Sequence, residues 1–280
     1  MQRFNKEIKM IALDIDGTTL TTNKELSERT RKALEGAIDK GVHIVFSTGR
    51  SYNSLSEAIK SLKGVSYVIT SNGAHINEFR AGKAIYNDYV YPGNVEKVLE
   101  LRKKYDIGIE VFIDGQAYID AKTYNDIKEN GCKYRNAEYV LWSRKPADDI
   151  DKLMLENKNT IENVNFCFDT KEKYDKAKDE IFAIEKATIT SSFRNSLELG
   201  GENTSKRTAL IELMKMLDVI PEQLMCCGDA PNDIPMIELA EIGVAMGNAW
   251  DEVKEKADFV TETNDADGVA IAIEKFVLQN

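Results

Sequence analysis

The chain has 280 residues, of which 42% are hydrophobic and 30% are charged, a composition typical of a globular protein with room for one or two domains. Lys and Arg number 37 against 47 Asp and Glu, which gives a net charge of -10 at pH 7. This charge argues against general binding to nucleic acid or to anionic membranes, because both require clustered positive charge. It leaves an anionic small molecule as a candidate partner, since a bound divalent metal reverses the local charge.

Targeting and redox signals are weak in this sequence. The N-terminal segment MQRFNKEIKMIALD contains no continuous apolar stretch of the kind found in signal peptides. No apolar run approaches the ~18 residues that a membrane span needs. The cysteines show no metal-ligand spacing, and the adjacent Cys226 and Cys227 lie in an apolar run that favours buried, reduced thiols. We therefore expect a cytoplasmic protein without a membrane partner.

The N-terminal part of the chain alternates between strand-like and helix-like patterns. Its predicted elements are, in order, a strand over 8–13, a helix from an N-cap at Ser27 to Gly41, a strand over 42–46, a helix over about 52–62 and a strand over 67–69.

The same alternation returns after residue 200. The predicted elements there are a helix over 205–217, a strand over 224–227, a helix over 234–239, a strand over 243–246, a helix over 251–256, a strand over 259–260 and a helix over 268–278. Repeated β-α-β units of this kind favour an α/β fold with a doubly wound, Rossmann-like parallel sheet.

The middle of the chain has a different character. Between Ala84 and Phe193, strand-like segments are mixed with charged helical patterns such as Glu172–Glu185. We therefore predict an α+β domain of residues 84–193 inserted into a core domain that is formed by residues 1–83 and 194–280.

Polar side chains follow four of the predicted strands directly. Asp14 and Thr48 come after the first two strands, Asn72 after the third, and Asp229 after the first strand beyond the insertion. Open doubly wound sheets bind ligands outside the carboxyl ends of their strands, where the strand order reverses. If the strand order is 3-2-1-4-5-6, Asp14 and Asp229 lie on neighbouring strands at that point.

Two acids at neighbouring strand ends suit a hard divalent cation such as Mg²⁺, which prefers oxygen ligands. The metal would stabilise ionised Asp14, which is then available as a nucleophile. Asp16 can take the opposite role and donate a proton, because two adjacent carboxylates tend to have pKa values that are pushed apart. The sequence thus predicts a metal site at Asp14 and Asp229, with a backbone carbonyl of the turn as a third ligand.

Other residues of the strand-end loops are suited to contact an anion. Thr48 offers a hydroxyl and Gly49 an accessible backbone amide, while Lys206 opens a helix and can neutralise phosphate charge. Asn232 and Asp233 can orient water or the lysine. Together these groups describe phosphoryl transfer, in which catalysis is mostly positioning and charge stabilisation.

Some polar residues also fit purely structural roles. Asn72 and Asn248 both suit turns and helix caps, and we favour a role in the site for Asn72 only. His43 lies in an apolar strand and is expected in the core rather than in catalysis.

With these residues in view, the sequence resembles the haloacid dehalogenase-like superfamily, and within it the Cof-type phosphatases of subfamily IIB. The first motif of the family matches residues 14–19, Asp-Ile-Asp-Gly-Thr-Thr, and the second matches Thr48. The third motif matches Lys206, and the fourth matches residues 228–233, Gly-Asp-Ala-Pro-Asn-Asp. The resemblance spans almost the whole chain.

This resemblance implies a magnesium-dependent phosphatase that forms an aspartyl-phosphate on Asp14, with Asp16 as general acid and base. Asp14 and Asp229 would bind the metal through their side chains and Asp16 through its backbone carbonyl. The inserted domain corresponds to the cap that selects the substrate in this family. A small phosphorylated metabolite, in the first place a sugar phosphate, is the expected partner.

Two other functions are compatible with the same residues. A phosphomutase shares the nucleophile and the acid but returns the phosphoryl group to the sugar. A sensor would bind a phosphorylated metabolite without turnover, although the set of Asp14, Asp16, Lys206 and Asp229 argues for catalysis.

Overall fold

The computed structural model describes residues 7–193 and 196–278. The chain divides into two compact units, the first made of Met1–Gly49, Leu55–Tyr86 and Ser205–Asn280, and the second of Arg50–Ser54 and Asn87–Thr204. Among the described residues, no helix combines the length and the hydropathy that crossing a bilayer requires.

The first unit is built on a sheet of eight described strands in the order β14-β13-β12-β1-β2-β3-β4-β5. These strands are β1 (Met10–Leu13), β2 (His43–Ser47), β3 (Tyr67–Thr70), β4 (His75–Glu78), β5 (Ala84–Asn87), β12 (Leu224–Gly228), β13 (Ile242–Ala245) and β14 (Phe259–Val260). The strands from β3 through β1 to β14 are parallel, and β4 runs antiparallel to β3. The parallel strands therefore follow the predicted order 3-2-1-4-5-6, which confirms the α/β fold class.

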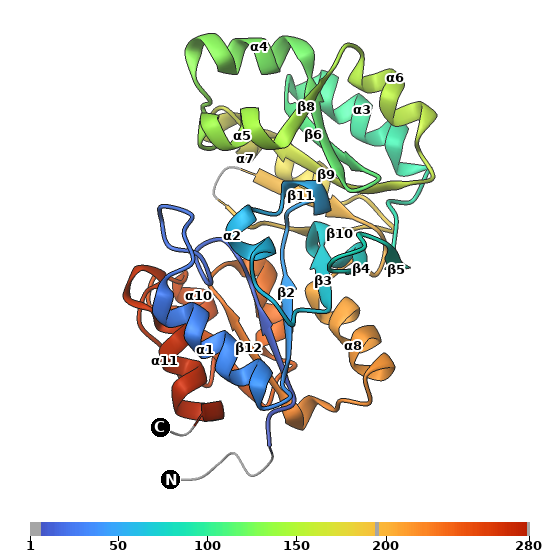
Figure 1. The fold of residues 1–280 in the computed structure, drawn as a ribbon. Helices are drawn as coiled ribbons and strands as arrows, with labels where there is room; N and C mark the ends of the chain where they lie inside the picture. The colour runs from blue at the N-terminus through green and yellow to red at the C-terminus, as the bar shows by residue number, and fades with distance from the viewer. Residues whose placement is uncertain (1–6, 194–195, 279–280) are drawn as a thin grey trace. The chain divides into compact units, whose positions relative to one another are not determined.

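Helices cover both faces of this sheet. They are α1 (Glu28–Asp39), α2 (Glu57–Lys60), α8 (Lys206–Met216), α9 (Ile234–Ile237), α10 (Asp251–Lys254) and α11 (Gly268–Ile273), which continues as a π-helical turn over Glu274–Leu278. Helix α1 packs against α11 on one side of the strands, while α8 lies on the other side (Figure 1). Ser27 caps α1 by accepting a hydrogen bond from the backbone N–H of Thr30, as its sequence position predicts.

Strand β1 lies in the centre of the sheet, so both of its edges and both of its faces are covered. All four residues of its sequence MIAL are buried, and they pair in parallel with β2 on one side and β12 on the other. A continuous apolar run is the pattern expected for such a strand. The backbone N–H of Asp14 donates to Cys227 O at 3.0 Å, so the ladder to β12 extends one residue past the strand and carries Asp14 to its carboxyl end.

The second unit is an α+β structure around a sheet with the strand order β10-β11-β9-β6-β7-β8. Its described strands are β6 (Gly108–Ile113), β7 (Gln116–Asp120), β8 (Arg144–Ala147), β9 (Ile161–Cys167), β10 (Thr188–Thr190) and β11 (Ser196–Gly200). Its α-helices are α3 (Asn94–Tyr105), α4 (Ala121–Asn130), α5 (Ala137–Ser143), α6 (Ile150–Glu156) and α7 (Lys171–Phe182).

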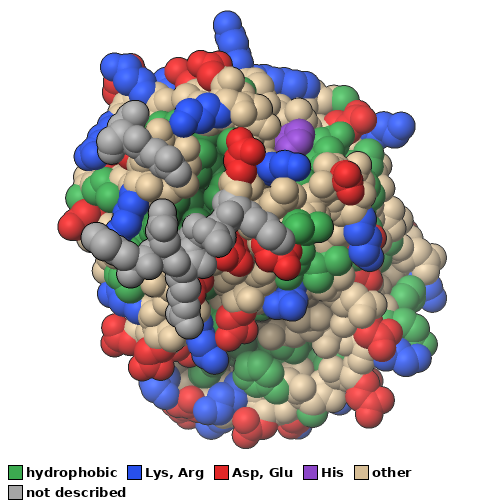
Figure 2. All heavy atoms as spheres, turned by 90° about the horizontal axis from the view of Figure 1, so that it is seen from below, with side chains coloured by type: hydrophobic (Ala, Val, Ile, Leu, Met, Phe, Trp, Pro, Cys, Tyr) green, Lys and Arg blue, Asp and Glu red, His purple; other side chains and the backbone are tan. Residues whose placement is uncertain are grey.

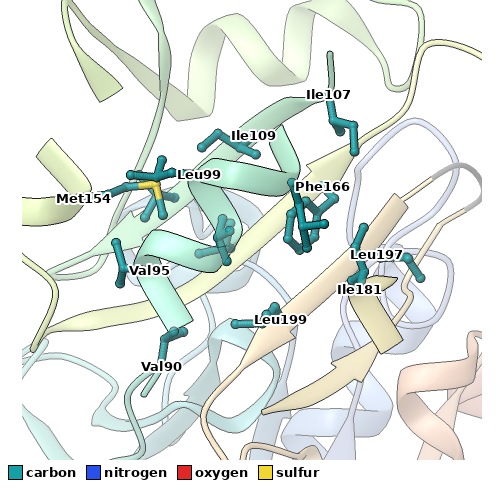
Figure 3. Close-up of a cluster of buried hydrophobic side chains, with 14 of the residues drawn as sticks. Val90, Val95, Leu99, Ile107, Ile109, Met154, Phe166, Ile181, Leu197 and Leu199 are labelled. Atoms are coloured by element: carbon teal, nitrogen blue, oxygen red, sulfur yellow. The ribbon is translucent and has the colours of Figure 1, made fainter. Parts of the chain in front are cut away.

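The core of the second unit lies between one face of this sheet and three of its helices. Side chains such as Leu99 from α3, Phe166 from β9 and Ile181 from α7 converge there (Figure 3). The unit thus has an apolar core of its own, as expected for an inserted domain.

Several predicted boundaries differ from the structure. Strand β5 joins the sheet of the first unit, so the chain leaves that unit after Tyr86 rather than at residue 84. Strand β11 pairs with β9, so the chain returns at Ser205 and not at residue 194, which lies outside the described residues. The helix predicted over 52–62 is a 3-10 turn at Tyr52–Ser54 followed by the short α2. His43 is exposed at the start of β2, so its placement in the core was wrong.

Candidate active site

A buried group of charged side chains lies at the carboxyl end of β1. Lys206 Nζ donates to Asp14 Oδ1 at 2.5 Å and to Asp233 Oδ1 at 2.6 Å. The side chains of Lys206 and Asp233 are fully buried, and that of Asp14 is 9% exposed. Asp14 and Lys206, which are 192 residues apart, thus form an ion pair from which water is largely excluded.

Local sequence features hold the partners of Asp14 in place. Lys206 is the first residue of α8, whose N-cap Ser205 accepts a hydrogen bond from the backbone of Thr208. Asp233 folds the turn after β12, because its Oδ2 accepts the backbone N–H groups of Asp229 and Ala230 at 2.9 and 3.0 Å. Its other oxygen is then left for Lys206.

Asp229 comes next to this group because β12 is the neighbour of β1. Thr18 Oγ1 donates to Asp229 Oδ1 at 2.8 Å. Gly17 has a φ of +79°, and a Cβ at this position would lie 2.5 Å from Asp229 Oδ2. Any other residue in place of Gly17 would therefore be strained and would also collide with the side chain of Asp229.

The electrostatics of this group are dominated by burial and by an excess of acids. Burial raises the pKa of Asp14 well above its ordinary value, Lys206 opposes this effect, and the charges of Asp233 and Asp229 add to it. Burial and the charge of Asp233 raise the pKa of Asp229 to about 7. Burial alone lowers the pKa of Lys206, but Asp14 and Asp233 outweigh it and raise this pKa above its ordinary range.

These acids fit a divalent cation. Among the described residues, Asp14, Asp229 and Asp233 offer carboxylate oxygens that lie within 4.8 Å of one another. Three carboxylates face a single ammonium group, so a divalent cation would balance the buried charge and favour the ionised acids. Oxygen ligands of this kind are those that Mg²⁺ prefers.

A second group of predicted residues surrounds the ends of β2 and β3. Asn232 Nδ2 donates to Asn72 Oδ1 at 2.9 Å, and the backbone N–H of Asn72 donates to Thr48 O at 3.0 Å. A Cβ on Gly49 would lie 3.0 Å from Asn72 Oδ1. Since Asn232 precedes Asp233 in the chain, this polar group borders the charged one. The structure therefore brings Thr48, Gly49, Asn72 and Asn232 together.

Asp16 is placed differently from Asp14. Its side chain is 36% exposed, and its Oδ1 accepts a hydrogen bond from Lys24 Nζ at 2.8 Å. Neither Lys24 nor Thr18 was predicted to belong to the site. The position of Thr18 beside two acids could have indicated a role in the site. No feature of the sequence indicates a role for Lys24, which lies eight residues after Asp16.

Thr19 also stabilises this turn. Its Oγ1 donates to Asp14 O at 2.6 Å.

Comparison with known proteins identifies the family. A family model described as haloacid dehalogenase-like hydrolase matches residues 11–273. The chain belongs to this family. The resemblance inferred from the motifs is thereby confirmed, as is the prediction of an enzyme of the phosphatase type.

Individual relatives agree with this assignment. The chain is 34% identical over 278 residues to the 5-amino-6-(5-phospho-D-ribitylamino)uracil phosphatase YcsE of Bacillus subtilis, with 99% of each chain covered. It is 29% identical to a second phosphatase of that name, YwtE of the same organism, with 96% of this chain and 98% of the relative covered. A haloacid dehalogenase-like hydrolase of known structure from B. subtilis is 27% identical, covers 96% of this chain and 100% of its own, and has a TM-score of 0.82.

Proposed function

We propose that the chain is a magnesium-dependent phosphatase of small phosphorylated metabolites, in the first place monoesters of sugars or sugar alcohols. The observation that carries this proposal is the buried ion pair between Asp14 and Lys206, beside the acids Asp229 and Asp233. The two B. subtilis relatives named for a phosphoribitylamino substrate support a polyol phosphate as the substrate class.

In the first step, an oxygen of Asp14 attacks phosphorus in line with the leaving oxygen. The P–O ester bond breaks, and Asp16 gives its proton to the departing alkoxide. Lys206 stays within hydrogen-bond distance of Asp14 and offsets the negative charge that gathers there. Thr48 and the backbone amide of Gly49 bind the phosphoryl oxygens.

In the second step, the aspartyl-phosphate on Asp14 is hydrolysed. Asp16, now ionised, takes a proton from a water molecule that attacks phosphorus and releases inorganic phosphate. Asp14 and Asp229 would hold the metal through their side chains and Asp16 through its carbonyl, while Asp233 keeps Lys206 in place. When bound, the metal would neutralise phosphate charge.

The second unit has the role of selecting the substrate in this proposal. Uncatalysed hydrolysis of phosphate monoesters needs accelerations of up to ~10²¹, so exclusion of competing water and full use of the charged groups are both required.

The cysteines among the described residues are free, which suits the reducing cytoplasm that we propose as the location of the enzyme.

Release of inorganic phosphate from a panel of substrates tests the proposal. The panel holds 5-amino-6-(5-phospho-D-ribitylamino)uracil, several hexose and pentose phosphates, and an aryl phosphate, each with and without Mg²⁺. We expect magnesium-dependent release that Asp14→Asn reduces at least about a thousandfold, because the nucleophile is lost. Asp39→Asn, a change at an exposed acid of α1, serves as the matched control.

Three results would contradict the proposal. Turnover that survives Asp14→Asn would show that another group attacks phosphorus. Conversion of a sugar phosphate into its isomer without stoichiometric release of phosphate would identify a mutase, and binding without any turnover would identify a sensor.

A further inference from the structure

Lys24 places its ammonium group on the carboxylate of Asp16. The distance from Nζ to Oδ1 is 2.8 Å, and the two side chains are 51% and 36% exposed. An exposed ion pair between two flexible side chains contributes little to stability, because ordering both side chains offsets the attraction. This pair differs from an ordinary surface pair because the backbone of Lys24 is itself held in place.

The backbone of Lys24 lies in a tight turn. Its N–H donates to Thr21 O at 2.8 Å, and Thr21 N–H donates to Glu25 O at 2.9 Å, which closes the turn. Lys24 has a φ of +65°, a left-handed conformation that is unfavourable for a residue with a side chain. Such a conformation persists only where the surrounding contacts determine it.

Those contacts come from the far end of the chain. The backbone N–H and the hydroxyl of Thr22 donate to the two carboxylate oxygens of Asp265, each at 2.7 Å. The adjacent Asn264 donates from Nδ2 to Leu20 O at 3.0 Å. The segment that follows Asp16 is therefore tied at two points to residues more than 240 positions later.

We propose that Lys24, held by the Thr22–Asp265 contact, is a positioning residue for Asp16. The inference rests on the proposed function, because it concerns the proton that Asp16 delivers to the leaving oxygen. A partly exposed aspartate can adopt several rotamers, whereas proton transfer requires hydrogen-bond distance to one oxygen. The ammonium of Lys24 holds one carboxylate oxygen and so fixes the direction of the other.

The dependence of turnover on the leaving group tests this role. The full chain with Mg²⁺ is assayed on phenyl phosphate, whose phenolate leaves poorly without a proton, and on 4-nitrophenyl phosphate, whose anion leaves readily. We expect Lys24→Met to lower kcat/KM on phenyl phosphate about tenfold or more and on 4-nitrophenyl phosphate by less than about threefold. The ratio kcat/KM reports the transfer of the phosphoryl group to Asp14 and not the later hydrolysis that both substrates share. Lys24→Arg retains the ion pair and should restore most of the loss.

Two further variants keep the test decisive. Lys32→Met removes an exposed lysine of α1 that pairs with Glu28, and it should leave both substrates unaffected. Asp265→Ala frees the turn without touching Lys24, and it should show the same selective loss on phenyl phosphate. If thermal unfolding shows that Lys24→Met does not fold, Asp265→Ala takes its place in the test.

The outcomes separate this inference from the proposed function. An equal loss of kcat/KM on both aryl phosphates would overturn the positioning role of Lys24. If the wild type released phosphate from neither compound, or if Asp14→Asn kept its activity on both, the proposed function itself would fail.

Discussion

Three carboxylates share one ammonium group at the ends of β1 and β12. Lys206 contacts Asp14 and Asp233 directly, and Asp229 adds a third negative charge within reach of both. Burial raises the pKa values of Asp14 and Asp229, and the negative charges of the neighbouring acids raise them further. Binding of a divalent cation should therefore release protons from these acids.

The stability of the metal-free protein should depend on Asp229. The folded chain keeps the proton of this acid up to its pKa of about 7, whereas the unfolded chain loses it near 3.8. Between these values the folded state binds more protons, so the free energy of unfolding falls as the pH rises. We expect the Tm in EDTA to fall from about pH 5 to about pH 7.5, and to fall less in Asp229→Asn.

Magnesium supplies the control for this measurement. The cation binds the ionised acids of the folded chain, so it should restore most of the Tm at the higher pH. Equal pH profiles of the wild type and Asp229→Asn in EDTA would contradict the raised pKa of Asp229.

Removal of the buried ammonium should be costly. Lys206→Met leaves Asp14 and Asp233 without their partner, and breaking a buried ion pair in this way typically costs about 3–5 kcal/mol. We expect a lower midpoint in urea unfolding at pH 8 and a loss of turnover, with Mg²⁺ offsetting part of the loss of stability. Lys215→Met, at an exposed position of the same helix, should change neither the urea midpoint nor the turnover. An unchanged midpoint in Lys206→Met would show that the buried ion pair does not stabilise the fold.

At the scale of elements, a strained turn sets the position of α8. Residues Ser71–Gly73 after β3 all have positive φ values, with Gly73 at +104°. A Cβ on Gly73 would lie 2.2 Å from Ser205 O and 3.0 Å from Lys206 N. The turn therefore packs directly against the first residues of the helix that carries Lys206.

This close contact predicts the effect of one added methyl group. Gly73→Ala should cost about 3 kcal/mol and lower kcat, because α8 must move away and take Lys206 with it. Gly41→Ala is the matched control, since Gly41 has a similar left-handed φ of +81° but no atom within 4 Å of the added Cβ. It should cost only about 1–2 kcal/mol and leave kcat unchanged. Similar losses in both variants, by urea unfolding and assay, would argue against packing as the cause.

At the scale of the whole molecule, the chain consists of two units that each bury a separate core. Acidic and basic side chains are interspersed on the face shown in Figure 2, and no single basic patch stands out there. This distribution accompanies a net charge of -10. The absence of a nucleic-acid partner stays a prediction.

The second unit contains its own buried ion pair. Arg144 on β8 donates to Glu110 Oε2 on β6 at 2.7 Å, and both side chains are at most 1% exposed. Arg144→Met should destabilise this unit by about 3–5 kcal/mol, because Glu110 would be left buried without its cationic partner. Lys145→Met changes the exposed neighbour and should have no effect. Equal urea midpoints of the two variants would contradict the prediction.

The sequence predicted the elements that are buried on both faces better than those at the edges. Strand β1 reads as a continuous apolar run, and its polar successor Asp14 marked the end of the strand. Strand β4 was missed because its residues HINE mix polar and apolar side chains, and only pairing with β3 makes them a strand. The residues of β5 were assigned to the inserted domain, because only their pairing with β4 shows that they belong to the sheet of the first unit.

The sequence by itself determined the alternation of strands and helices, the class of fold and the acids at the strand ends, because these follow from local hydrophobic periodicity. Only the tertiary structure decided that Lys206 contacts Asp14 across 192 residues and that Lys24 pairs with Asp16. Such contacts depend on the path of the backbone and on burial, which are set by interactions between distant segments. No local pattern in the chain encodes them.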